Sequence, residues 1–291
     1  MKLLLAVIMG GVVLFGTLVA LVFGYFEYKQ LPIYNLRTAT KFLAGKSNYT
    51  NYEGIIEKLG YSKGDKLLII HADDLGLSKS VNKASFSALK KGYVSSGSIM
   101  MPCDYVSEVR EFANENPKID LGLHLTVTSE WRDYKWGGVL NPTKTPSLIN
   151  EKGVFPKTPK QFVLNAEARE LKKELQAQID LSRSMGLNPT HIDSHEGALF
   201  FNEDLFRVYL EVGEENKLPV FVPKAVAIHF DKKFPKPKNL VVIENFFMAE
   251  SGLKHDNWET FYLNTLDNVM PRKFTFFFLI ELGHNIFLLN L

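Results

Sequence analysis

Two hydrophobic patterns alternate along most of this chain. From residue 66 onward, short apolar runs are separated by longer amphipathic segments. The short runs predict β-strands and the longer segments predict helices. Strands are predicted at 66–71, 95–101, 119–127, 189–194, 218–222, 239–244 and 273–280, and helices at 80–91, 105–115, 165–186 and 203–216.

Strands that alternate with helices of this length predict a parallel sheet with helical crossovers. About seven strands in roughly 225 residues suit a deformed or incomplete (β/α) barrel better than a small open sheet. The predicted fold class is therefore α/β, with 65–291 as one domain after a linker at 27–64. Residues 130–155 are rich in Trp, Gly, Pro and Lys, and they predict a long loop over the strand ends.

The amino-terminal segment has a different pattern. No side chain from Leu3 to Phe26 is charged, and about 24 residues in a helix can span a bilayer. The stretch is apolar all round, which disfavours a buried soluble helix. A signal peptide, the alternative, has a shorter apolar core of about 7–15 residues before a cleavage site of small residues. We predict that residues 1–26 form one N-terminal transmembrane helix or, failing that, a signal segment.

Composition narrows the class of protein. With 46% hydrophobic and 23% charged residues the chain is typical of a globular protein, and a net charge of +2 gives no electrostatic case for nucleic acid. Cys103 is the single cysteine, so there is no internal disulfide and no CxxC zinc site. Positive charges flank the apolar stretch on both sides, so the positive-inside count hardly discriminates between the two orientations. We expect a short tail inside and the domain at 65–291 outside the cytoplasm.

Two aspartates, Asp73 and Asp74, follow the first predicted strand. Neighbouring residues of a regular strand point to opposite faces, so the pair can share a pocket only where the backbone turns. Residues 75–78 (Leu-Gly-Leu-Ser) supply such a turn. One carboxylate could then bind a metal while the other acts as a base. The alternative is that one of the aspartates caps the turn.

Histidines occur at two further strand ends. His124 lies opposite a leucine face, among small and hydroxyl residues. His191, Asp193 and His195 follow one another at every second position, so they share one side of a strand. A lone histidine is more often a hydrogen-bonded core residue, and the second segment could be a polar strand end. Together, however, the segments favour a metal site in which His195 is a ligand and Asp193 or His191 supports an imidazole.

The long loop carries Trp131 and Trp136. Flat aromatic faces often contact sugar rings, so both are candidate substrate-binding residues. Ordinary packing within the loop is the alternative.

Three motifs occur in a fixed order along the chain. They are Ala-Asp-Asp-x-Gly-x-Ser at 72–78, Gly-x-His-Leu at 122–125 and Thr-His-x-Asp-Ser-His at 190–195. Their order and spacing resemble the YdjC/ChbG group of carbohydrate deacetylases over residues 66–215. The resemblance implies a deformed (β/α) barrel that uses a divalent metal to remove acetyl groups from N-acetylated sugars such as chito-oligosaccharides.

By resemblance, Asp74, His124 and His195 are the metal ligands, and Asp73 is the base that activates a metal-bound water. The resemblance points to Mg²⁺, although two histidines also suit Zn²⁺. The expected partners are an N-acetylated carbohydrate and, through the N-terminal segment, a membrane. The oligomeric state is not readable from the sequence.

The carboxyl terminus departs from the family pattern. The family carries a further histidine after its last strands, and His284 lies in that region with different neighbours. His284 is therefore the candidate proton donor, and the apolar tail up to Leu291 predicts a truncated C-terminus. This departure motivates an alternative function, a membrane-anchored glycan-binding protein whose catalysis has decayed. A metal phosphoesterase is disfavoured because the chain has no Gly-rich phosphate cradle.

Overall fold

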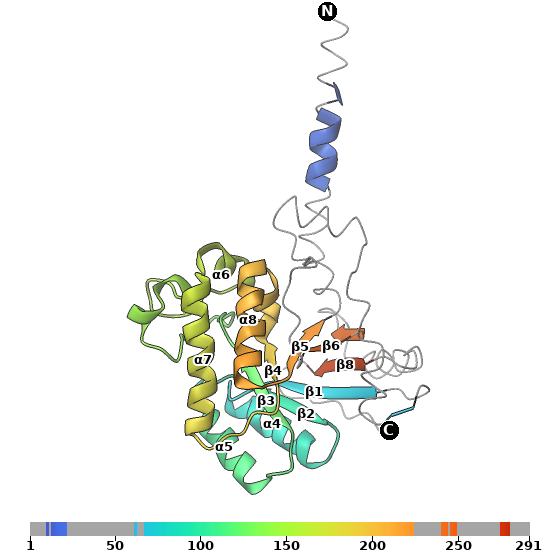
Figure 1. The fold of residues 1–291 in the computed structure, drawn as a ribbon, viewed down its shortest axis with the longest axis vertical. Helices are drawn as coiled ribbons and strands as arrows, with labels where there is room; N and C mark the ends of the chain where they lie inside the picture. The colour runs from blue at the N-terminus through green and yellow to red at the C-terminus, as the bar shows by residue number, and fades with distance from the viewer. Residues whose placement is uncertain are drawn as a thin grey trace, which may run out of the picture. The chain divides into compact units, whose positions relative to one another are not determined.

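A computed structural model describes residues 10–11, 13–21, 61–62, 67–223, 240–243, 245–248 and 274–279. The chain divides into two compact units, Met1–Gly45 and Lys46–Leu291, and each is described by itself (Figure 1).

In the first unit, residues 10–11 and 13–21 are helical, and their large apolar side chains are exposed. None of the helices in the described residues has both the length and the apolarity needed to cross a membrane. The rest of the predicted 1–26 span, and most of the predicted linker, lie outside the described residues. The transmembrane helix therefore stays a prediction.

The second unit is built on one parallel sheet (Figure 1). Its strands are β1 (Leu67–Leu75), β2 (Ser96–Ile99), β3 (Leu121–Leu125), β4 (Ile192–Ser194), β5 (Val220–Pro223), β6 (Leu240–Ile243), β7 (Asn245–Met248) and β8 (Phe274–Leu279). All paired neighbours run parallel, in the order β6-β5-β4-β3-β2-β1-β8-β7. This is the strand order of a (β/α) barrel that is open between β6 and β7. The prediction of an incomplete parallel barrel is confirmed.

The described residues contain one strand more than the sequence pattern predicted. A single residue separates β6 from β7, and the sequence pattern predicted only one strand here, at 239–244. In the structure β6 pairs with β5, whereas β7 pairs with β8 at the other edge of the sheet. Hydrophobicity cannot reveal this division, because the pairing partners lie far away in the chain.

Three of the helices in the described residues begin at polar capping residues. The helices are α4 (Lys79–Lys90), α5 (Val106–Glu115), α6 (Pro159–Asn165), α7 (Ala168–Ser184) and α8 (Glu203–Asn216), with short 3-10 segments at Pro142–Lys144, Pro146–Leu148 and His195–Phe200. Ser78, Thr158 and Asn202 each accept a backbone N–H from the first turn of α4, α6 and α8. The helix predicted at 165–186 corresponds to α7, and the short helix α6, which was not predicted, precedes it; Ala166 and Glu167 between the two are extended.

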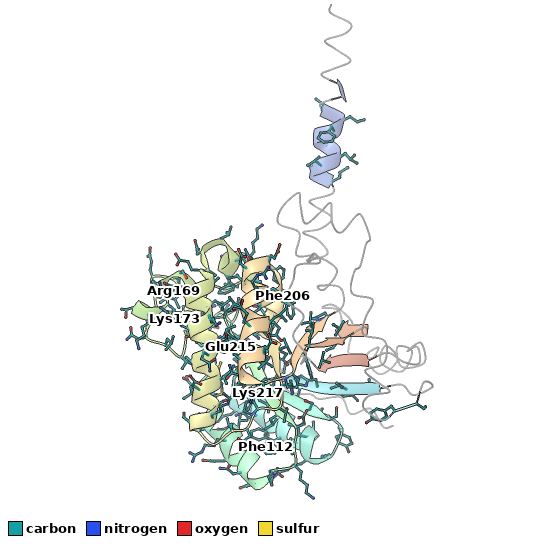
Figure 2. All side chains as sticks on the ribbon, viewed as in Figure 1. Phe112, Arg169, Lys173, Phe206, Glu215 and Lys217 are labelled. Atoms are coloured by element: carbon teal, nitrogen blue, oxygen red, sulfur yellow. The ribbon has the colours of Figure 1, made fainter. Side chains whose placement is uncertain are left out.

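Helix α7 shows why these segments are helical. Leu171, Leu175 and Ile179 recur at helical spacing and are fully buried, whereas Arg169 and Lys173 lie on the outer face (Figure 2). The buried stripe packs into the core, and α8 lies beside α7 on the same layer (Figure 1). These two helices therefore fix the ends of β3 and β4, where site residues lie.

The long loop predicted at 130–155 is present and is attached to α7. The fully buried carboxylate of Glu174 accepts the backbone N–H groups of Val139 and Leu140, at 2.8 and 3.0 Å. A side chain at Gly138 would collide with this carboxylate, so only glycine allows the approach. Helix α7 therefore holds this part of the loop in place.

Candidate metal centre

The first strand contains a backbone break at the predicted aspartate pair. Strand β1 continues through Asp73 and Asp74 to Leu75, but the register with β2 shifts between Ala72 and Leu75. Asp74 has a φ of 63°, in the left-handed region that non-glycine residues rarely adopt. This break overcomes the alternation of a regular strand, and both carboxylates reach the same group of histidines.

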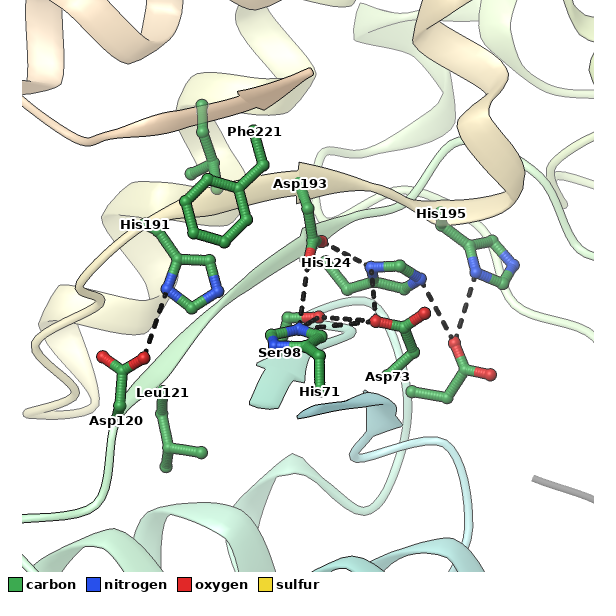
Figure 3. Close-up of polar contacts among 12 residues, drawn as sticks. His71, Asp73, Ser98, Asp120, Leu121, His124, His191, Asp193, His195 and Phe221 are labelled. Atoms are coloured by element: carbon green, nitrogen blue, oxygen red, sulfur yellow. Dashed lines mark hydrogen bonds and ion pairs between the residues drawn. The ribbon is translucent and has the colours of Figure 1, made fainter. Parts of the chain in front are cut away.

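The structure brings the three predicted ligands together. Asp74 Oδ1 lies 3.4 Å from His124 Nε2 and 3.3 Å from His195 Nδ1 (Figure 3). Ligands held about 2.0–2.1 Å from a tetrahedral ion stand about 3.4 Å apart. The spacing of one carboxylate oxygen and two imidazole nitrogens therefore fits a divalent metal ion.

The imidazoles of His124 and His195 each contact a second carboxylate through the ring nitrogen that faces away from Asp74. His124 Nδ1 lies 2.5 Å from Asp193 Oδ1, and His195 Nε2 lies 3.0 Å from Glu130 Oε2. Such carboxylates fix the ring orientation and tautomer of a metal-binding histidine. Asp193 takes the supporting position predicted for it. Glu130 was missed, and its place at the start of the long loop is the signal that could have found it.

His191, also predicted to support an imidazole, lies deeper in the barrel. Its Nδ1 is 2.9 Å from Thr190 Oγ1, and its ring stacks on Phe221 at 4.5 Å (Figure 3). A side chain at Gly122 would collide with the ring. Burial lowers the pKa of His191 to about 4, so the ring is neutral. Its Nδ1 also lies 3.9 Å from Asp120 Oδ2, and its ring lies 5.3 Å from that of His71.

Asp73, the predicted base, lies next to His71, Ser98 and the candidate ligand His124. Its Oδ1 is 3.4 Å from both His71 Nε2 and Ser98 Oγ, and 3.9 Å from His124 Nδ1. His71 also lies 3.1 Å from Asp193 Oδ2, so it joins the two aspartates. Burial raises the pKa of Asp73 to about 7, close to the value that suits a general base at neutral pH.

Charge in the site is balanced between carboxylates and imidazoles. Burial alone would lower the pKa of His124, but Asp193 and Asp73 raise it to about 9. The pKa of His195 is likewise held above its usual range, against burial, by Asp74 and Glu130. Without an ion, the His124 ring is therefore protonated at neutral pH, and an ion that binds it would have to displace that proton.

The two predicted substrate-binding tryptophans have different surroundings. Trp136 is 3% exposed, its Nε1 donates to the Thr128 carbonyl, and its ring lies 6.2 Å from that of His195. Trp136 is therefore buried and packs against the candidate ligand His195, which differs from the contact with a sugar that was predicted for it. Trp131 is 39% exposed. The predicted proton donor His284 lies outside the described residues.

The family model for YdjC-like proteins matches residues 67–277, which include all three motif segments. The chain belongs to the YdjC-like family. A carbohydrate deacetylase of Thermus thermophilus is 36% identical over 224 residues, which cover 72% of this chain and 75% of that protein. A chitooligosaccharide deacetylase of Yersinia enterocolitica is also 36% identical, over 64% of this chain and 71% of that protein.

The YdjC-like fold is also seen in a solved structure. A protein of Enterococcus faecalis V583, named for cellobiose-phosphate cleavage, superposes with a TM-score of 0.62 at 24% identity. The match covers 76% of this chain and 83% of that one. At this identity the likeness concerns the fold alone, and it agrees with the incomplete parallel barrel described above.

Removing either carboxylate that supports an imidazole, Glu130 or Asp193, should weaken metal binding. In Glu130→Gln and Asp193→Asn, the charge that orients an imidazole is lost, and we expect metal affinity to fall about 10–100-fold. Chelator competition on the purified protein measures this affinity. Glu151→Gln, an exposed change on the same loop, is the control and should leave affinity unchanged. Unchanged affinity in both test variants would contradict the supporting role.

Metal affinity should rise with pH. Because His124 has a pKa of about 9, protons compete with the ion below that pH and cease to compete above it. We expect affinity to increase about tenfold per pH unit between pH 6 and 8 for each proton displaced. Calorimetry in buffers of different ionisation enthalpy counts the released protons. A flat affinity with no proton release would show that the imidazoles are not ligands.

Proposed function

We propose that this protein is a metal-dependent carbohydrate deacetylase that hydrolyses the acetamide of an N-acetylated sugar, such as a chito-oligosaccharide. The observation that carries the proposal is the convergence of Asp74, His124 and His195, with Asp73 beside them. Membership of the YdjC-like family and the names of the relatives from Thermus thermophilus and Yersinia enterocolitica support the same reaction class.

Asp74, His124 and His195 would hold one divalent ion. When bound, the ion would polarise the acetamide carbonyl and make water easier to deprotonate. The family resemblance favours Mg²⁺, whereas two imidazoles and one carboxylate suit Zn²⁺. Metal analysis of the purified protein distinguishes the two.

The chain's own residues would manage the protons of the reaction. Asp73 would accept a proton from the attacking water, since its raised pKa suits this task near pH 7. His71 and Ser98 hold this carboxylate in place, while Asp193 and Glu130 keep the two imidazoles in the tautomers that the ion requires. The leaving amine must gain a proton, and His284 stays the predicted donor.

The proposal also includes a membrane location. The uncharged stretch from Leu3 to Phe26 supports an N-terminal anchor with the catalytic domain outside the cytoplasm. Protease digestion of intact cells or spheroplasts tests this directly. We expect the domain to sediment with membranes and to be cleaved from outside, whereas a domain released in soluble form would contradict the anchor.

Asp73→Asn should abolish most of the activity while the metal stays bound. The amide cannot accept a proton, so we expect kcat for acetate release to fall about 10²–10⁴-fold. Acetate is measured on N-acetylated oligosaccharides, and metal content is measured on the same preparation. Asp180→Asn, an exposed change on α7, is the control.

Normal turnover by Asp73→Asn would remove the proposed base. If the metal-loaded wild type binds such sugars and releases no acetate from a broad panel of them, the glycan-binding alternative replaces the proposed reaction.

A further inference from the structure

The turn at residues 129–136 carries an exposed aromatic ring next in the chain to a residue of the candidate metal centre. Glu130 of this turn contacts the candidate ligand His195 at 3.0 Å. Trp131 is the next residue, so its Cα lies about 3.8 Å from that of Glu130. Its side chain is 39% exposed. A solvent-facing indole and a carboxylate on a candidate ligand thus stand on consecutive residues.

The base of this turn is held by three hydrogen bonds. The Trp136 backbone N–H donates to Ser129 Oγ at 3.1 Å, and Trp136 Nε1 donates to the Thr128 carbonyl at 2.8 Å. Lys135 Nζ donates to the Ser129 carbonyl at 2.5 Å. These bonds hold the two ends of the turn together, which limits the ordering that the turn needs when a ligand binds.

The ring of Tyr134 contacts both the exposed ring of Trp131 and the buried ring of Trp136. The Tyr134 ring lies 6.4 Å from Trp131 at 77° and 5.5 Å from Trp136. The Tyr134 hydroxyl accepts the backbone N–H of Asp104, which follows β2. A continuous series of ring contacts therefore runs from His195 outward to Trp131, and it is tied to two neighbouring strand ends.

The charges of the turn favour an uncharged ligand. Arg132 and Asp133 are 89% and 79% exposed, and they pair with each other at 2.8 Å. The exposed surface at Trp131 thus combines an aromatic face with the Arg132–Asp133 ion pair, whose two charges cancel. A pyranose ring has an apolar C–H face and polar edges, which matches an indole face with polar neighbours.

We propose that Trp131, braced by Tyr134, is a stacking subsite for the sugar unit adjacent to the unit that reaches the metal. Such a subsite would favour an oligosaccharide over a single acetylated sugar, because only the longer ligand could contact Trp131 and the metal together. This inference rests on the proposed deacetylase function and adds the chain length that the site selects.

The test compares acetate release from N-acetylglucosamine with release from its β-1,4-linked trimer, using the metal-loaded full chain. In Trp131→Ala we expect kcat/KM for the trimer to fall about tenfold, mainly through KM, with the value for the monosaccharide unchanged. Trp131→Phe keeps a flat ring and should retain most of the activity on the trimer. Arg132→Ala, a neighbouring exposed change, is the matched control.

Equal losses on monomer and trimer, or no loss on either, would overturn the subsite. So would a loss in Arg132→Ala as large as that in Trp131→Ala. If the wild type releases no acetate from either sugar, the proposed reaction fails on these substrates, and calorimetry with the trimer decides the subsite separately. Weaker trimer binding in Trp131→Ala would uphold the subsite; equal binding, or none by the wild type, would refute it.

Discussion

Neighbouring side chains of a regular strand point to opposite faces, and the candidate centre needs two consecutive carboxylates on one side. The left-handed backbone at Asp74 and the register shift in β1 meet this requirement. The histidines come from β3 and from the end of β4, which follow ordinary geometry. Without the break in β1, either the proposed base or the proposed ligand would turn away from them. Every later feature of the site depends on this one irregular strand.

The second organising feature is the way in which buried charge is distributed. Carboxylates and imidazoles alternate from Glu130 through His195, Asp74 and His124 to Asp193. A buried carboxylate without a partner would cost several kcal/mol, and alternation avoids that cost without a long basic side chain. It also explains why the supporting residues come from separate elements, since each ring needs an acceptor at a fixed angle.

The sequence was sufficient for much of the fold and for the central part of the site. The carboxyl ends of parallel strands lie at a common edge of the sheet, so the sequence alone predicts that motif residues at strand ends, such as Asp74 and His195, lie close together. Glu130 was missed because a loop carboxylate has no periodic pattern, and its place at the start of the predicted loop is the one sequence signal for it. His191 shows the opposite problem: its spacing from His195 put it on the correct side, but depth along the barrel axis is set by packing against Phe221 and Gly122. Likewise, hydrophobicity did not separate Trp131 from the buried Trp136.

The raised pKa values of His124 and His195 bear on how the proposed centre would take up an ion. In the absence of an ion, the raised pKa values favour protonated rings, and their positive charge partly offsets the carboxylates around them. In the proposed centre, an ion would then exchange for protons on imidazoles that Asp193 and Glu130 already hold in place, so that loading with metal is itself a pH-dependent step.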